Sequence, residues 1–169
     1  MGRSGPDDGL AHRGASRGVR LIGLDHGARR IGVAIGDTET GMAFARPAIQ
    51  RRNLDHDLAL VGELCTTEGA GLVVVGLPLN MDGTEGDQAA AARAFAEGLS
   101  GIGLAVAYED ERLSSWQAAE ELAGGGRQAA RGSGELDSAA ARVILQQYLD
   151  ARRPPAGQRS DPEWPEETE

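Results

Sequence analysis

Three acidic positions spread along the chain are the residues most able to carry chemistry. Asp25 ends one hydrophobic stretch, the run Glu109-Asp110-Glu111 follows another, and Asp137 begins a stretch with helical periodicity. Carboxylates that converge on one cleft repel one another unless cations neutralise them. Such oxygen ligands suit Mg²⁺ or Mn²⁺. Two ions about 4 Å apart could activate a water and stabilise the leaving oxygen when a phosphodiester bond is cut.

Each acid also has a structural interpretation that the sequence leaves open. Asp25 can cap a turn, because Asx side chains bond their own backbone there, and Asp137 can stabilise a helix start through the helix dipole. The acidic run can be a solvated strand end. Because side chains alternate along a strand, Glu109 and Glu111 are expected on one face and Asp110 on the other.

The pattern of strands and helices expected around these acids indicates an α/β fold. Residues Val19 to Asp37 read as two strands joined by a tight turn, and residues 42–49 contain a third strand in which Pro47 suits an edge or a strand end. The β-branched run at residues 72–75 is typical of a central strand covered on both faces. The last strand is expected over residues 104–108.

Helical spacing is found in four places. The first helix begins at Leu54 with Asn53 as its N-cap and ends at Gly69 or Gly71. Further helices are expected over residues 87–99, from Ser114 or Ser115 to Ala123, and from Leu136 onward. In the last helix one stripe is expected to be buried: Leu136, Ala140, Val143, Ile144 and Tyr148.

Two loops are candidates for function. Residues 76–86 form a connection longer than an ordinary loop, at the carboxyl end of a strand where open α/β sheets bind ligands. Asn80, Asp82 and Thr84 in this loop are hydrogen-bonding candidates for a substrate. The Gly- and Arg-rich segment 124–134 is expected to be mobile, and it could close over a substrate.

Length and composition fit one cytoplasmic domain. We expect a disordered arm over residues 1–18, a folded domain over 19–150 and a disordered acidic tail over 151–169. The single cysteine, Cys65, excludes a disulfide framework and a Cys-based zinc site. The formal net charge is −9, and all 17 basic residues are arginine. The attraction of a nucleic-acid partner would therefore depend on bound divalent cations and on local arginines such as Arg29, Arg30, Arg46, Arg51 and Arg52.

Four segments, in order and spacing, resemble a known family. They are LDHGARRIGVAIGD (24–37), VVVGLPLNMDGTEG (73–86), DERLSSWQA (110–118) and LDSAAARVILQQYL (136–149). The sequence resembles the YqgF family, also called RuvX or the Holliday-junction-resolvase-like family, within the ribonuclease H superfamily. The resemblance implies an RNase H-like fold, with a mixed five-stranded sheet whose first three strands are antiparallel and with helices on both faces.

The resemblance also implies an activity. It points to a cytoplasmic, metal-dependent nuclease whose catalytic and metal-binding acids are Asp25, Glu111 and Asp137, with Asp110 as an alternative ligand. The implied reaction is maturation of the 5′ end of pre-16S rRNA. One alternative is resolution of four-way DNA junctions, which would require a homodimer, whereas a monomer suffices for rRNA trimming. The other alternative is an rRNA- or ribosome-binding module without catalytic activity.

Basic residues near these motifs are expected contacts for nucleic acid. Arg29 and Arg30 stand where the family has basic residues, and Arg112 directly follows the acidic run. The sequence departs from the family's first motif at His26 and Ala28, where an apolar or small residue and a Thr or Ser are more common. His26 is disfavoured as a metal ligand or general base, because no histidine cluster accompanies it.

Overall fold

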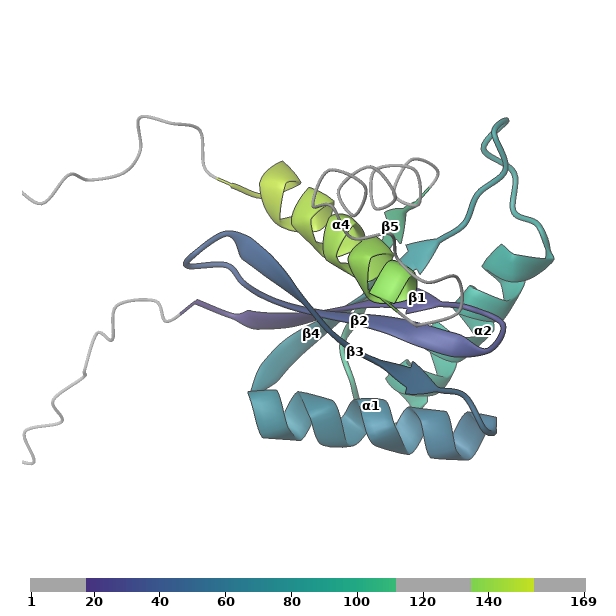
Figure 1. The fold of residues 1–169 in the computed structure, drawn as a ribbon, viewed down its shortest axis with the longest axis horizontal. Coiled ribbons are helices and arrows are strands. Elements are labelled where there is room, and N and C mark those ends of the chain that lie inside the picture. Colours follow the sequence, from purple (N-terminus) through teal and green to yellow (C-terminus); the bar gives the residue numbers. More distant parts are fainter. Residues whose placement is uncertain (1–17, 112–134, 154–169) are drawn as a thin grey trace, which may run out of the picture.

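The computed structural model describes residues 18–111 and 135–153, and Figure 1 shows how they fold. The strands are β1 (Arg20–His26), β2 (Arg30–Asp37), β3 (Met42–Gln50), β4 (Ala70–Leu77) and β5 (Val106–Asp110). The described helices are α1 (Leu54–Glu68), α2 (Asp87–Gly101) and α4 (Glu135–Ala151). No helix in these two ranges is long and apolar enough to span a membrane.

The strands form one five-stranded sheet in the order β3-β2-β1-β4-β5. β2 pairs antiparallel with both β1 and β3, whereas β4 pairs parallel with both β1 and β5. The predicted mixed sheet is therefore confirmed. β3 lies at an edge, where a proline such as Pro47 is tolerated. β4 was expected to be central; it is an interior strand, and β1 holds the middle position.

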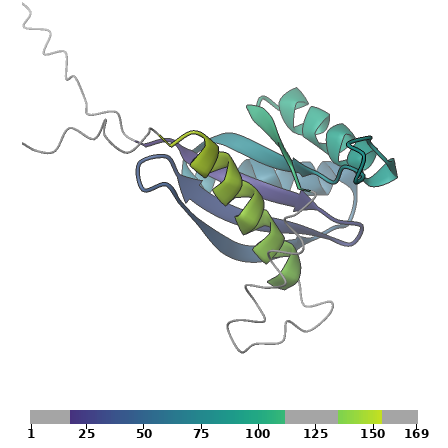
Figure 2. The same ribbon diagram turned by 90° about the horizontal axis from the view of Figure 1, so that it is seen from above.

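Helices cover both faces of the sheet, as expected (Figures 1 and 2). On one face, α1 and α2 pack against apolar side chains that include Ile22, Leu24 and Val75. On the other face, α4 crosses the strands and buries Ile144 and Leu145. Burial of apolar surface on both sides fixes the register of the interior strands, because a shift by one residue would exchange their faces.

The sheet face beneath α4 is lined by glycines. A Cβ atom at Gly23 would lie 2.7 Å from the Cβ of Leu145, and one at Gly36 would lie 2.9 Å from Leu149. A Cβ at Gly32 would overlap the carbonyl oxygen of Asp137. The absence of these side chains lets α4 lie close against the sheet, so that its first turn reaches the carboxyl end of β1.

Short-range signals define both ends of α1. The Asn53 side chain accepts a hydrogen bond from the His56 backbone N–H at 2.8 Å, which is an N-cap interaction. Gly69 ends the helix with a φ of 65°, in the left-handed region that glycine adopts readily. Both predicted helix ends are confirmed.

Two predictions about element ends and burial are wrong. β5 begins at Val106 and not at Leu104, because the Leu104 N–H donates to the Leu99 carbonyl at 3.1 Å and so still belongs to the turn that leaves α2. Leu136 was expected in the buried stripe of the last helix but is 40% exposed. The predicted stripe also omitted buried residues of α4 that face the glycine-lined sheet: Ala141, Leu145 and Leu149.

Several expectations lie outside the described residues. They are the disordered arm up to residue 17, Arg112, the helix expected from Ser114 or Ser115, the segment expected to be mobile, and the tail beyond residue 153. α4 itself extends to Ala151, one residue past the expected domain end at 150.

Candidate active site

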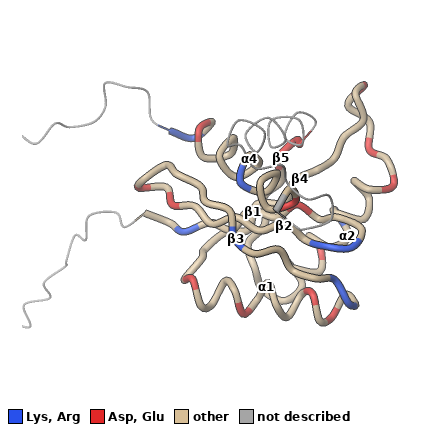
Figure 3. The backbone as a smooth tube through the Cα atoms, in the orientation of Figure 1, with Lys and Arg blue, Asp and Glu red and all other residues tan. Residues whose placement is uncertain are grey.

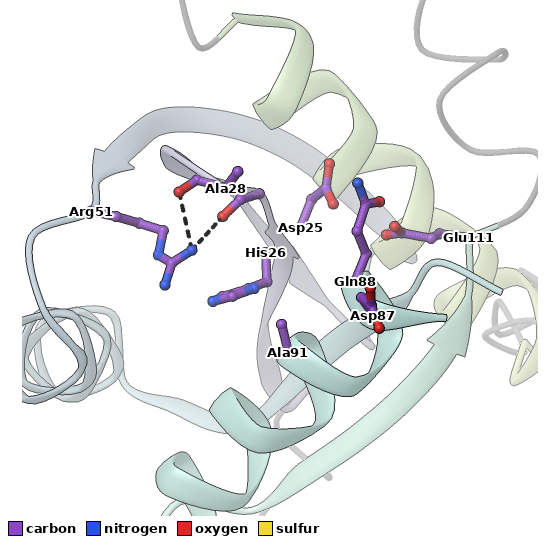
Figure 4. Close-up of a pocket in the computed structure, with 9 residues that line it drawn as sticks. Asp25, His26, Ala28, Arg51, Asp87, Gln88, Ala91 and Glu111 are labelled. Atoms are coloured by element: carbon purple, nitrogen blue, oxygen red, sulfur yellow. Dashed lines mark hydrogen bonds between the residues drawn. The ribbon is translucent and has the colours of Figure 1, made fainter. Parts of the chain in front are cut away.

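Asp25 and Glu111 come together at the carboxyl end of the parallel strands. Asp25 lies near the end of β1, Glu111 directly follows β5, and β4 runs between them. Gly76 of β4 lies in this gap, and a Cβ there would overlap the Oε2 atom of Glu111. Glu111 therefore reaches across β4 toward Asp25, close enough for the two carboxyl groups to shift each other's pKa. Figure 4 shows both side chains pointing into the same pocket.

The electrostatics of this pair follow from burial and mutual repulsion. Burial raises the pKa of Asp25 to about 6, and the charge of Asp137 adds to the rise, although the hydrogen bond with Glu111 opposes it. Burial, the Asp25 charge and hydrogen bonding toward Asp25 together raise the pKa of Glu111 to about 8. With this raised pKa, the pair holds a proton near neutral pH.

Asp137 approaches the pair from the first turn of α4. Its charge raises the pKa of Asp25, so the two carboxylates are close enough to interact. Arg30 of β2 faces Asp137, with its Nη1 atom 3.9 Å from Oδ2. The next residue, Ser138, is buried, and its Oγ accepts a hydrogen bond from the Val33 N–H at 3.4 Å. The start of α4 is thus attached to β2 beside the acids.

The donor set fits a hard divalent cation. Asp25 and Glu111 offer only oxygen atoms, and the buried Oε2 of Glu111 has no hydrogen-bond partner among the described residues. Within the described ranges, no three His, Cys, Asp or Glu side chains are already grouped closely enough to hold a metal ion. The structure therefore brings Asp25 and Glu111 together and leaves Asp137 nearby, without a preformed group of three ligands.

The two acids open into a pocket of about 460 Å³. In Figure 4 the acids lie at one end, Arg51 lies at the other, and Gln88 extends from α2 toward the acids. The described lining residues are Asp25, His26, Gly27, Ala28, Arg51, Asp87, Gln88, Ala91 and Glu111. Asp110, the alternative ligand, is not among them, although its charge contributes to the raised pKa of Glu111.

His26 forms part of the pocket wall. Its ring packs against Phe95 of α2, with the ring centroids 4.8 Å apart. Burial and the positive charge of Arg51 lower the pKa of His26 to about 4. His26 is therefore neutral at physiological pH and carries no positive charge into the pocket.

Arg51 is a pocket residue that the predicted catalytic site did not include, although the sequence places it among the arginines that could attract a nucleic acid. Its Nη1 atom donates hydrogen bonds to the carbonyl oxygens of Gly27 (2.9 Å) and Ala28 (3.2 Å), drawn in Figure 4. Its Nε atom lies 3.6 Å from the carboxylate of Asp57, which is buried in the first turn of α1. No local motif marks Arg51 or Gln88, because only the tertiary fold brings β3, α2 and the β1–β2 turn together.

The three loop residues predicted to contact a substrate form hydrogen bonds mainly with one another. Asn80 Nδ2 donates to Thr84 Oγ1 at 3.0 Å, and Thr84 donates to Asp82 Oδ1 through its N–H (2.9 Å) and its hydroxyl (2.6 Å). Gly83 completes the turn with a φ of 85°. These bonds define the shape of the loop. Contact of the loop with nucleic acid stays a prediction, as it does for Arg29, which is exposed in the β1–β2 turn.

Proteins named as nucleases are similar to this chain over most of its length. A protein of Anaeromyxobacter dehalogenans named "Putative pre-16S rRNA nuclease" is 44% identical over 137 residues, which are 80% of this chain and 100% of that one. A protein of the same name from Symbiobacterium thermophilum is 46% identical over 140 residues, 81% of this chain and 97% of that one.

A solved structure, T. thermophilus RuvC in complex with a Holliday junction substrate, shares the fold with a TM-score of 0.50 at 18% identity, covering 79% of this chain and 95% of that chain. The family described as "RuvX: Holliday junction resolvase" matches residues 19–151. As the four sequence segments predicted, the chain belongs to the RuvX family.

Proposed function

We propose that this protein is a metal-dependent nuclease that hydrolyses phosphodiester bonds and trims the 5′ end of pre-16S rRNA in the cytoplasm. The observation that carries the proposal is the contact between Asp25 and Glu111 across Gly76, at the end of a pocket that is open to a substrate. Two half-buried carboxyl groups that hold a proton near neutral pH are costly to a fold, and such perturbed pairs are typical of functional sites. The names of the relatives support RNA as the substrate.

Asp25, Glu111 and Asp137 would hold Mg²⁺ or Mn²⁺, most simply as two ions, with Asp110 as an alternative to Glu111. When bound there, such ions lower the pKa of a coordinated water and neutralise charge on the phosphate and the leaving oxygen. The proton held between Asp25 and Glu111 must leave before both groups can act as ligands. Arg30 faces Asp137 and limits the repulsion between that carboxylate and Asp25.

The test is cleavage of two labelled substrates, an RNA that contains the 5′ leader of pre-16S rRNA and a four-way DNA junction, with and without Mn²⁺. Asp25→Asn and Glu111→Gln should each reduce the rate of RNA cleavage by more than about 100-fold, because each removes a ligand that contributes several kcal/mol. Glu63→Gln, at an exposed position of α1, is the matched control and should leave the rate unchanged. RNA that is cut equally well by Asp25→Asn would refute the proposal.

A second candidate is resolution of branched DNA, which the description of the matching family favours. Symmetric cutting of a junction needs two active sites and hence a homodimer. If the junction is cut and the RNA is not, the resolvase assignment replaces the first. If neither is cut and Mn²⁺ does not raise the melting temperature, the protein is a binding module without catalytic activity.

A further inference from the structure

The end of the pocket opposite the acids is positively charged. Among the described residues that line the pocket, Arg51 is the only arginine or lysine. The exposed residues Arg29 and Arg52 flank this end, and neither has a carboxylate partner among the residues that the structure describes. Figure 3 shows these basic segments at the same end of the sheet, in a protein whose net charge is −9.

The guanidinium group of Arg51 is held in place by the backbone around it. The Arg51 N–H donates to the Arg29 carbonyl at 3.0 Å, and Nη1 bonds the Gly27 and Ala28 carbonyls. Nε is buried and faces Asp57 at 3.6 Å, so it is not available to a ligand. A guanidinium has five N–H donors in a fixed plane, so the two donors of Nη2 remain for a ligand, and the held group loses little entropy on binding one.

The negative charge of Asp57 does not prevent Arg51 from binding an anion. Its buried carboxylate accepts a hydrogen bond from the Arg52 N–H at 3.1 Å and lies 3.3 Å from His56 Nδ1, so donors other than Arg51 also satisfy it. Elsewhere on the molecule arginines pair with carboxylates that are more exposed than Asp57: Arg20 and Arg46 pair with Glu68, and Arg93 pairs with Glu85. The positive charge beside the pocket is thus set apart from these surface ion pairs.

We propose that Arg51 binds a second phosphate of the substrate strand, one that flanks the phosphate to be cut. The acids at one end of the pocket repel a bare phosphate, whereas Arg51 at the other end attracts one. A strand whose scissile phosphate lies at Asp25 and Glu111 would therefore be oriented by a neighbouring phosphate at Arg51, with Arg29 and Arg52 guiding the chain beyond it. This inference rests on the proposed nuclease function and adds the path of the substrate to it.

The test is a phosphate-interference measurement. The probe is a 2′-O-methyl RNA strand of the cut sequence, or the DNA strand if junctions are cut, with one neutral methylphosphonate linkage placed at successive positions. Binding is measured with the Asp25→Asn protein, which keeps Arg51, and with the same protein carrying Arg51→Gln. One flanking methylphosphonate should weaken binding by the first protein about 10-fold, the strength of a charge-assisted hydrogen bond. It should weaken binding by the second less than about 2-fold, because the partner of that phosphate is gone.

Two controls separate binding from folding. Arg46→Gln removes the same charge from β3 at a position paired with Glu68, and it should keep the full interference pattern. Arg51→Lys retains the charge if Arg51→Gln destabilises the β1–β2 turn, and it should keep a weaker signal at the same linkage. A melting curve for each variant verifies that it is folded. In addition, Arg51→Gln should reduce the salt dependence of binding by about 0.7 in slope, as expected for one lost contact to a single strand.

The outcomes distinguish a failure of this inference from a failure of the proposed nuclease function. If the protein without substitutions cuts its substrate, but folded Arg51→Gln shows the same interference at every linkage, Arg51 does not bind a phosphate and the nuclease assignment stands. If the protein without substitutions neither binds nor cuts nucleic acid, the proposed function fails and this inference fails with it.

Discussion

Glu111 reaches the carboxyl group of Asp25 across β4, through the space left by the missing side chain of Gly76. The register makes this contact possible: Gly76 pairs with Glu109 of β5, so Glu111 lies two residues further on, beyond the end of the strand. Any larger residue at position 76 would stand between the two acids. Gly76 is therefore part of the site although it has no functional group.

The first prediction concerns Gly76→Ala. Its Cβ would overlap Glu111 Oε2 and lie 2.6 Å from Ile144 Cδ1, so both side chains must move. Overpacking of this kind costs about 1–3 kcal/mol, and we expect Mn²⁺-dependent cleavage to be lost in a protein that still folds. Gly62→Ala is the control: its Cβ would make only an ordinary contact of 3.6 Å, and alanine in a helix adds up to about 1 kcal/mol. Full activity in Gly76→Ala would refute the role assigned to this position.

The second prediction concerns Gly32→Ala in β2. Here the added Cβ overlaps main-chain atoms of Asp137 and lies 2.9 Å from the Ser138 nitrogen, and a helix backbone cannot move aside as a side chain can. We expect a larger loss than for Gly76→Ala, above about 2 kcal/mol, or at least 4 °C in melting temperature for a chain of this size. Calorimetry of both variants in one buffer measures the difference. Equal melting temperatures would show that α4 is not held against the sheet at Gly32.

The third prediction is that the metal-free protein becomes less stable as the pH rises from about 4 to 8. The pKa values of Asp25, about 6, and Glu111, about 8, lie above the ordinary values of 3.8 and 4.5. Between the ordinary and the raised values these two groups bind more protons in the folded protein than in the unfolded chain, so their contribution to stability falls with rising pH. His26, whose pKa is lowered from 6.5 to about 4, acts in the opposite direction over that range, but its shift is smaller than the two carboxyl shifts together. Glu111→Gln removes the carboxyl group with the larger of the two pKa shifts. The melting temperatures of the protein without substitutions and of Glu111→Gln are measured in EDTA. From pH 5 to pH 8, the first should fall relative to the second. A difference between the two melting temperatures that stays constant over this range would contradict the raised pKa values.

The fourth prediction is that binding of Mn²⁺ releases about one proton at pH 7. Glu111 is largely protonated there, because burial and Asp25 hold its pKa at about 8, whereas a carboxyl group must be ionised to act as a ligand. The apparent affinity for Mn²⁺ should therefore increase from pH 6 to pH 8. Titration calorimetry in buffers with different ionisation enthalpies counts the released protons. Binding without proton release, or with Glu111→Gln unchanged in affinity, would mean that the cation binds elsewhere.

The sequence was informative where neighbouring residues decide the outcome. The β1–β2 hairpin and the two ends of α1 depend on local turn and cap residues, and they are where the sequence predicts them. The mixed sheet, its three antiparallel first strands and the proximity of Asp25 to Glu111 followed from the family resemblance, whereas the order of the strands was not predicted. The participation of Asp137 in metal binding stays a prediction.

The sequence was less informative where distant segments decide the outcome. Leu104 has a suitable residue type for a strand, but its hydrogen bond to Leu99 keeps it in the preceding turn. The stripe of α4 that contacts the sheet could not be predicted without knowing that glycines line the opposite surface. Arg51 became a site residue only because β3 ends beside the β1–β2 turn.

The parallel pairing of β1 with β4 also determines when a newly made chain becomes active. The chain between these two strands contains β2, β3 and α1. Bringing the ends of such a long segment together costs conformational entropy before the strand pairing can stabilise the sheet, so this pairing forms late. Glu111 joins Asp25 only after β5 has added to β4. We therefore expect a partly folded chain to lack a working site, so that a nascent molecule cannot degrade RNA before its sheet is complete.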